Sequence, residues 1–163
     1  MDIKLFAFNL AVMRATAEAP KEVYKDTPVY VSNDACETLC PGNTVPFAGI
    51  CGVRFASNPE TITHCIFCNN KFMELAEDVR HIAFEHEIGH KIYQHTSEHN
   101  MPSLLELFGF KGKYLKQEME ADAYAASVVG KDAVIRALKC VVKDYPLLSR
   151  LLVQYRFNAL NKL

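Results

Sequence analysis

The chain has 163 residues, half of them hydrophobic, and a formal net charge of -1 from 18 Lys and Arg against 19 Asp and Glu. This length predicts a single domain, residues 1–163, with enough apolar side chains for a core. The balanced charge provides neither a basic patch for nucleic acid nor an acidic run typical of a disordered tail. No apolar run approaches ~20 residues, so we expect no membrane span and a cytoplasmic protein.

The N-terminal segment allows two interpretations. Leu5–Met13 is apolar, and Ala17–Ala19 has the small residues of a signal-peptide cleavage site. However, Asp2 opposes the positive charge that begins a signal peptide, and Arg14 closely follows the apolar run. We therefore favour an amphipathic helix over residues 3–18 that packs on the core.

Three segments in the N-terminal half mix β-branched and aromatic residues, which is typical of strands. They are Pro28–Ser32, Gly49–Phe55 and Ile62–Phe67. Residues 33–47 contain Asn, Asp, Pro and Gly and predict a loop, and residues 57–59 predict a turn. The expected result is a small antiparallel or mixed sheet.

From about Lys71 the sequence period changes to helical, whereas residues 96–114 are mixed. Apolar and histidine positions then recur at steps of three and four: Leu75, Val79, Ile82, His86, His90 and Tyr93. This phase places both histidines on the inward face.

The remaining helices are predicted from their start and stop signals. Tyr114–Val129 is followed by Gly130, which favours a helix end. Further helices are expected over Asp132–Val142 and Leu147–Asn161, whereas Ser103–Phe110 forms either a packed connection or a flap. The fold class is therefore α+β: a small sheet packed on an active-site helix, followed by a helical C-terminal half.

The segment His86-Glu87-Ile88-Gly89-His90 is an H-E-x-x-H motif within the first of these helices. Residues four apart share one helical face, so both imidazoles can reach one metal ion. Glu87 is then placed to contact a metal-bound water. This arrangement is typical of zinc-assisted peptide hydrolysis and predicts Glu87 as the general base.

A catalytic zinc ion commonly takes three protein ligands, so a third must lie elsewhere. Thr96 excludes the third histidine of an extended motif, and Ile82 excludes the inverted H-x-x-E-H order. Glu118 is the predicted third ligand. Asp122, four residues later on the same face, is expected to accept a hydrogen bond from a ligand histidine. Glu120 faces another direction and is expected to be solvated.

The combination of H-E-x-G-H with E-x-x-A-D-x-x-A resembles the gluzincin metallopeptidases, in particular the M48 core, the minigluzincins and the M78 peptidases. The matching residues are His86, Glu87, Gly89, His90, Glu118, Ala121, Asp122 and Ala125. The resemblance implies a zincin-like fold, one catalytic Zn²⁺ and a peptide or protein substrate. It also implies an edge strand, Ile62–Phe67, that would pair with the extended substrate. Candidate oxyanion donors are Tyr93, His95, Tyr124 and Arg156.

Two questions stay open at the level of sequence. Cys65-x-x-Cys68 with Cys36-x-x-x-Cys40 could hold a second, structural zinc ion or form disulfides, but free thiols are favoured; Cys140 is expected in the core. The alternative function is a metal-binding regulatory or interaction protein, either a repressor-directed protease or a non-catalytic binding module that retains the zincin fold.

Overall fold

The computed structural model describes residues 3–40, 45–95, 112–143 and 147–163. The chain divides into two compact units, Met1–Leu75 and Ala76–Leu163, and each is described by itself. The predicted single domain, and the packing of the sheet on the active-site helix, stay predictions. The predicted Ser103–Phe110 segment lies outside the described residues. Among those described, no helix is long and apolar enough to cross a membrane.

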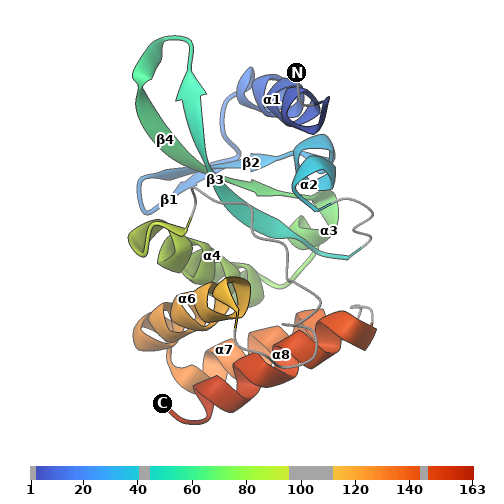
Figure 1. Cartoon of the computed structure of the whole chain (residues 1–163), viewed down its shortest axis with the longest axis vertical. Helices are drawn as coiled ribbons and strands as arrows, with labels where there is room; N and C mark the ends of the chain where they lie inside the picture. The colour runs from blue at the N-terminus through green and yellow to red at the C-terminus, as the bar shows by residue number, and fades with distance from the viewer. Residues whose placement is uncertain (1–2, 41–44, 96–111, 144–146) are drawn as a thin grey trace. The chain divides into compact units, whose positions relative to one another are not determined.

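The first unit is built around a four-stranded mixed sheet with the strand order β1-β2-β4-β3 (Figure 1). Its elements are α1 (Ile3–Thr16), β1 (Glu22–Tyr24), β2 (Thr27–Val31), α2 (Asn33–Leu39), β3 (Ala48–Phe55), β4 (Asn58–Cys68) and α3 (Asn70–Met73). β1 and β3 pair antiparallel with their neighbours, whereas β2 and β4 run parallel. The sheet and the helices of the C-terminal half confirm the predicted α+β class.

Two predictions for this unit are wrong. The first is the loop over residues 33–47, because residues 33–39 form α2. Ser32 caps this helix by accepting a hydrogen bond from the Ala35 amide, and Ala35 and Cys36 are buried beneath it. The second is the edge strand, because β4 lies between β2 and β3. Local sequence does not encode strand order, so the apolar run of β4 fits a central strand equally well.

The core of the first unit lies between α1, α2 and the sheet. Ala11 and Val12 from α1 pack with Cys36 from α2 and with Val53 and Phe67 from the sheet. The observed α1 is close to the predicted 3–18 helix, and its buried residues lie one turn before its end. Burial of these apolar side chains stabilises the unit.

The second unit is a helical layer formed by α4 (Glu77–Ile92), α6 (Lys113–Val129), α7 (Lys131–Val142) and α8 (Leu147–Leu160). Helix α6 contacts the other three. Its buried Ala125 packs with Val134, Leu138, Val153 and Leu160 from α7 and α8. The predicted C-terminal helices are confirmed, and Gly130 ends α6 with a φ of 88°, a backbone conformation that favours glycine.

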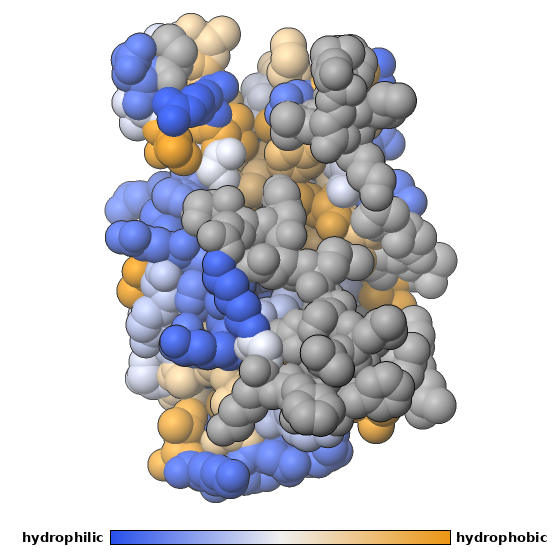
Figure 2. All heavy atoms as spheres, in the orientation of Figure 1, coloured by the Kyte–Doolittle hydropathy of each residue, from blue (hydrophilic) through white to orange (hydrophobic). Residues whose placement is uncertain are grey.

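The surface of the second unit shows separate hydrophobic groups among hydrophilic side chains on the face drawn in Figure 2. The exposed large apolar residues of this unit include Ile92, Tyr93, Val128 and Leu151. Scattered apolar residues of this kind are normal for a folded protein and need no partner.

The six cysteines are all free thiols. Cys51 and Cys65 face each other across β3 and β4, and both are buried. One cluster of three possible metal ligands is found among the described residues, and it contains no cysteine. Cys140 is exposed, so its predicted core position is wrong. It lies two residues after the buried Leu138, which turns it away from the apolar face of α7.

The burial of the sheet cysteines predicts selective alkylation. Burial raises the pKa of Cys51 to about 12 and that of Cys65 to about 11, since the interior disfavours the thiolate. At pH 8 nearly all Cys51 side chains are therefore protonated and unreactive, whereas Cys140 is exposed to solvent. Iodoacetamide should therefore modify Cys140 first, and Cys51 and Cys65 only after unfolding. Peptide mass mapping over time measures this order, and Cys140→Ser should remove the fast reaction. Equal rates at Cys51 and Cys140 would contradict the burial.

Candidate metal centre

The H-E-x-x-H motif lies in the C-terminal half of α4, as predicted. His86 and His90 are one turn apart, and their rings meet edge to face with centroids 4.7 Å apart. The two Nε2 atoms are 3.1 Å from each other. Each of these side chains is 13% exposed, so the pair is shielded but can be reached from outside.

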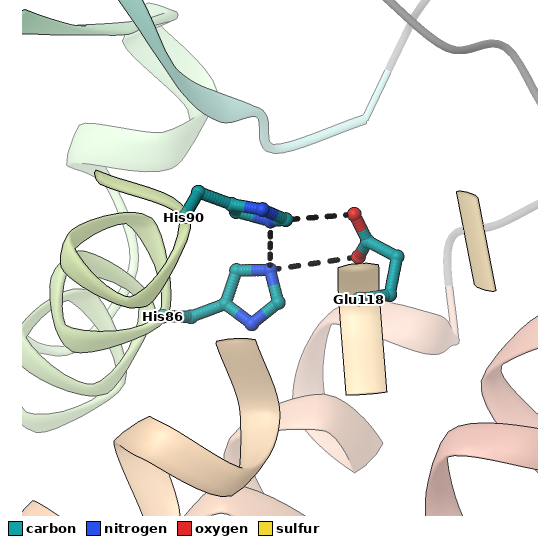
Figure 3. A group of neighbouring side chains, drawn as sticks. All are labelled: His86, His90 and Glu118. Carbon is teal, nitrogen blue, oxygen red and sulfur yellow. Dashed lines mark hydrogen bonds and ion pairs between the residues drawn. The ribbon is translucent and has the colours of Figure 1, made fainter. Parts of the chain in front are cut away.

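Helix α6 brings Glu118 to the same point. One carboxylate oxygen lies 3.4 Å from Nε2 of His90, and the other lies 3.5 Å from Nε2 of His86. Figure 3 shows the three side chains pointing toward one another from the two helices. One donor atom from each falls within 4.8 Å of the other two. The three predicted ligands therefore form a group that could bind a metal ion.

The two helices touch at Gly89, between the ligand histidines in sequence. A methyl group at Gly89 would lie 2.9 Å from Cα and 3.0 Å from the carbonyl oxygen of Ala121 on α6. Real Cβ atoms do not approach backbone this closely, so only glycine fits here. Gly89 was named only as a residue of the H-E-x-G-H motif, and its role at this contact was not predicted.

Asp122 supports His86 as predicted. Its Oδ1 lies 2.9 Å from Nδ1 of His86, and the carboxylate is almost fully buried. An ionised carboxylate only accepts hydrogen bonds, so Nδ1 of His86 carries the proton. In the neutral ring the lone pair is then on Nε2, facing Glu118 and His90.

His90 has a second histidine behind it. Its Nδ1 lies 3.1 Å from Nδ1 of His95, and Nε2 of His95 lies 3.1 Å from Oε2 of Glu120. Glu120 is partly solvated, as predicted, with 37% of its side chain exposed, and it also accepts a hydrogen bond from His95. Burial, followed by the nearby His90, lowers the pKa of His95, which favours its neutral form.

Arg156 from α8 joins the two carboxylates of α6. Its Nε and Nη2 each donate to Asp122 at 2.7 Å, and Nη1 lies 2.9 Å from Glu118. Burial alone would raise the pKa of Glu118, but Arg156 and then His86 hold it well below its ordinary value. Arg156 was predicted among the oxyanion donors, yet its guanidinium is already engaged by Asp122 and Glu118.

The donor set fits a divalent cation. The Nδ1 protons of His86 and His90 point toward Asp122 and His95. The two neutral imidazoles therefore present their Nε2 lone pairs toward the carboxylate of Glu118. A cluster of electron pairs and negative charge of this kind needs a positive charge. In the metal-free protein a proton supplies it. Burial lowers the pKa of His86, but hydrogen bonds to Asp122 and Glu118 outweigh this effect and raise it to about 10. A bound metal ion would replace that proton.

The remaining candidate residues are placed as follows. Glu87 is buried at 8% exposure, next to His86 in sequence. Tyr93 is about half exposed and stacks on His95 with centroids 5.7 Å apart. Tyr124 lies beside Gly89 at the contact between α4 and α6. An oxyanion role for the two tyrosines and His95 stays a prediction.

Comparisons with protein-family models, with curated proteins and with solved structures found no match for this chain.

The close contact at Gly89 predicts the effect of one added methyl group. Helix propensity alone would make Gly89→Ala more stable by about 1 kcal/mol. The clash is with backbone atoms of Ala121, so the helices must separate, and overpacking of this kind costs about 1–3 kcal/mol. We expect a net loss of stability and weaker binding of a divalent metal ion. Urea unfolding and a chelator competition measure both quantities. A variant more stable than the wild type would contradict the backbone contact.

The buried ion pairs predict a large loss of stability when Arg156 is removed. In Arg156→Met, Asp122 and Glu118 lose their shared cation, and an uncompensated buried charge costs about 3–5 kcal/mol. Arg136→Met is the matched control, because Arg136 is exposed on α7. Chemical unfolding of the metal-free proteins should show the loss in Arg156→Met alone. Equal unfolding midpoints for the two variants would show that Arg156 does not neutralise the site.

Proposed function

We propose that this protein is a zinc-dependent metalloendopeptidase of the gluzincin type. The observation that carries the proposal is the convergence of His86, His90 and Glu118 from two helices, with Asp122 directly behind His86. Two imidazoles and one carboxylate are the ligands of a catalytic zinc site that leaves a position for water. The H-E-x-x-H motif adds a carboxylate next to the first ligand.

His86, His90 and Glu118 would hold the metal ion. A zinc ion in this position would supply a Lewis acid that lowers the pKa of bound water to about 7. Asp122 keeps the proton of His86 on Nδ1 and thereby keeps Nε2 available as a ligand. Arg156 neutralises carboxylates that would otherwise repel each other.

Glu87 is assigned the transfer of the proton. In this role its carboxylate accepts a proton from the attacking water and delivers it to the nitrogen of the leaving amine. Glu87 is buried, and a carboxylate that water solvates poorly accepts a proton more readily. The substrate class proposed is a peptide or a protein.

Peptide-library cleavage by the wild type and Glu87→Gln tests this function. We expect Glu87→Gln to retain one zinc ion per chain and to lower kcat/KM by about 10²–10⁴, since loss of a general base has effects of this size. Glu85→Gln is the matched control, because Glu85 lies on the same helix and is also buried. Metal content and thermal unfolding are measured for each protein.

Two results would overturn the proposal. Equal cleavage by the wild type and Glu87→Gln removes Glu87 as the base. A wild type that binds one zinc ion, loses it in His86→Ala and cleaves no peptide would instead support the metal-binding regulatory protein.

A further inference from the structure

His95 occupies an unusual position just beyond the end of α4. The helix ends at Ile92, and Gln94 then has a φ of 59°, in the left-handed region. This turn directs the chain back, so that the His95 ring lies 5.3 Å from the ring of His90. Tyr93 stacks on His95, and the His95 side chain is only 9% exposed. The ring is therefore held in one place by its neighbours.

The hydrogen bonds of His95 define the positions of two protons. The Glu120 carboxylate only accepts, so Nε2 of His95 is the donor across their 3.1 Å contact. A neutral His95 then has its lone pair on Nδ1. The proton in the 3.1 Å contact between the two Nδ1 atoms consequently belongs to His90. This leaves the lone pair of His90 on Nε2, the atom that faces Glu118.

His86 also carries its proton on Nδ1, and here a single hydrogen bond to a carboxylate is enough. Asp122 accepts directly from its Nδ1, which leaves Nε2 toward Glu118. The two ligand histidines thus have the same tautomer, and each is backed by a carboxylate of α6. The connection from His90 to its carboxylate, Glu120, passes through one additional imidazole, that of His95. His95 is not a further ligand of the same ion, because its Nδ1 contacts the ring nitrogen of His90 that points away from Glu118.

We propose that His95 and Glu120 form a second supporting arm that positions His90 for metal binding. The proposal rests on the metal site of the proposed function and identifies two of its positioning residues. His95 orients the His90 ring and fixes the proton on Nδ1, and Glu120 fixes the orientation of His95. Lys116 lies 3.6 Å from the other oxygen of Glu120 and helps to hold that carboxylate in place.

Metal affinity provides the first test, with Co²⁺ as the probe in competition with a chromophoric chelator. His95→Phe keeps a ring but cannot accept from His90, so its affinity should fall by about 10–100-fold, the usual cost of losing such a partner. His95→Gln can accept from His90 and donate to Glu120, so it should restore affinity to within about threefold of the wild type. His64→Gln, in the first unit, is the matched control.

Glu120→Ala gives a second variant that does not threaten the fold, because the side chain is partly exposed. It should weaken binding less than His95→Phe, since His95 still contacts His90 in its absence. Thermal unfolding of the metal-free variants separates this effect from a general loss of structure.

Proton NMR of the Co²⁺ protein provides a readout that a merely structural role would not change. The wild type should show two exchangeable, hyperfine-shifted imidazole N–H signals, one from each ligand histidine. His95→Phe should lose one of them by exchange with water, and His95→Gln should restore it. The same signal should be present in His64→Gln.

The outcomes distinguish this arm from the metal site itself. Unchanged affinity with both signals present in His95→Phe and Glu120→Ala overturns the arm and leaves the metal site standing. A wild type that binds no Co²⁺, or binds it equally well after His86→Ala, overturns the metal site and the arm together. Loss of affinity and of one signal in His95→Phe, with recovery in His95→Gln, supports the arm whether or not the protein cleaves peptides.

Discussion

The backbone contact between Gly89 and Ala121 sets the distance across which the metal ligands must meet. Helices normally pack about 8–10 Å apart, with side chains between them. At this contact a single methyl group on α4 would lie 2.9 Å from the backbone of α6. Histidine and glutamate side chains can then converge from the two helices without long or strained conformations. The supporting carboxylate of Asp122 reaches His86 for the same reason, since it lies one turn after Glu118.

The close approach of the helices brings the negative charges of Glu118 and Asp122 together, and Arg156 balances them. Glu118 and Asp122 are both shielded from water, and two buried carboxylates repel each other strongly. The guanidinium donates to both and satisfies several of their acceptor positions at once. A proton on His86, or a metal ion in its place, supplies the remaining positive charge. Helix α8 is therefore part of the candidate metal centre, although it contributes none of the three candidate ligands.

Much of this centre could be predicted from the sequence, because its main signals are local. His86 and His90 are four residues apart on one helix, as are Glu118 and Asp122, and helical geometry brings each pair to one face. The arm through His95 gives no such signal. It depends on the left-handed turn at Gln94 and on the distance to another helix. The contact made by Glu120 could not be predicted for the same reason, since its partner His95 comes from beyond the end of α4.

The fold shows the same division between local and distant information. Strand β2 and helices α6, α7 and α8 lie close to their predicted bounds. Strand β4 begins at Asn58, within the predicted turn, and the helical pattern expected from near Lys71 is divided into α3 and α4. Helix α2 was missed because Asn33 and Asp34 also favour loops, whereas the Ser32 cap and the burial of Ala35 decide for a helix. The interior position of β4 depends on pairing with two distant strands, which no local pattern contains.

The two arms behind the ligand histidines differ in their access to solvent. Asp122 is buried, and Arg156 fills its remaining acceptor positions, so salt has little effect on this arm. The arm behind His90 ends at Glu120, whose side chain is 37% exposed. Ions in solution can screen this carboxylate and loosen its hold on His95. His86 is thus held by a closed network, whereas the support of His90 responds to the solvent. This asymmetry follows from α6 itself, because Asp122 shares the face of Glu118 and Glu120 does not.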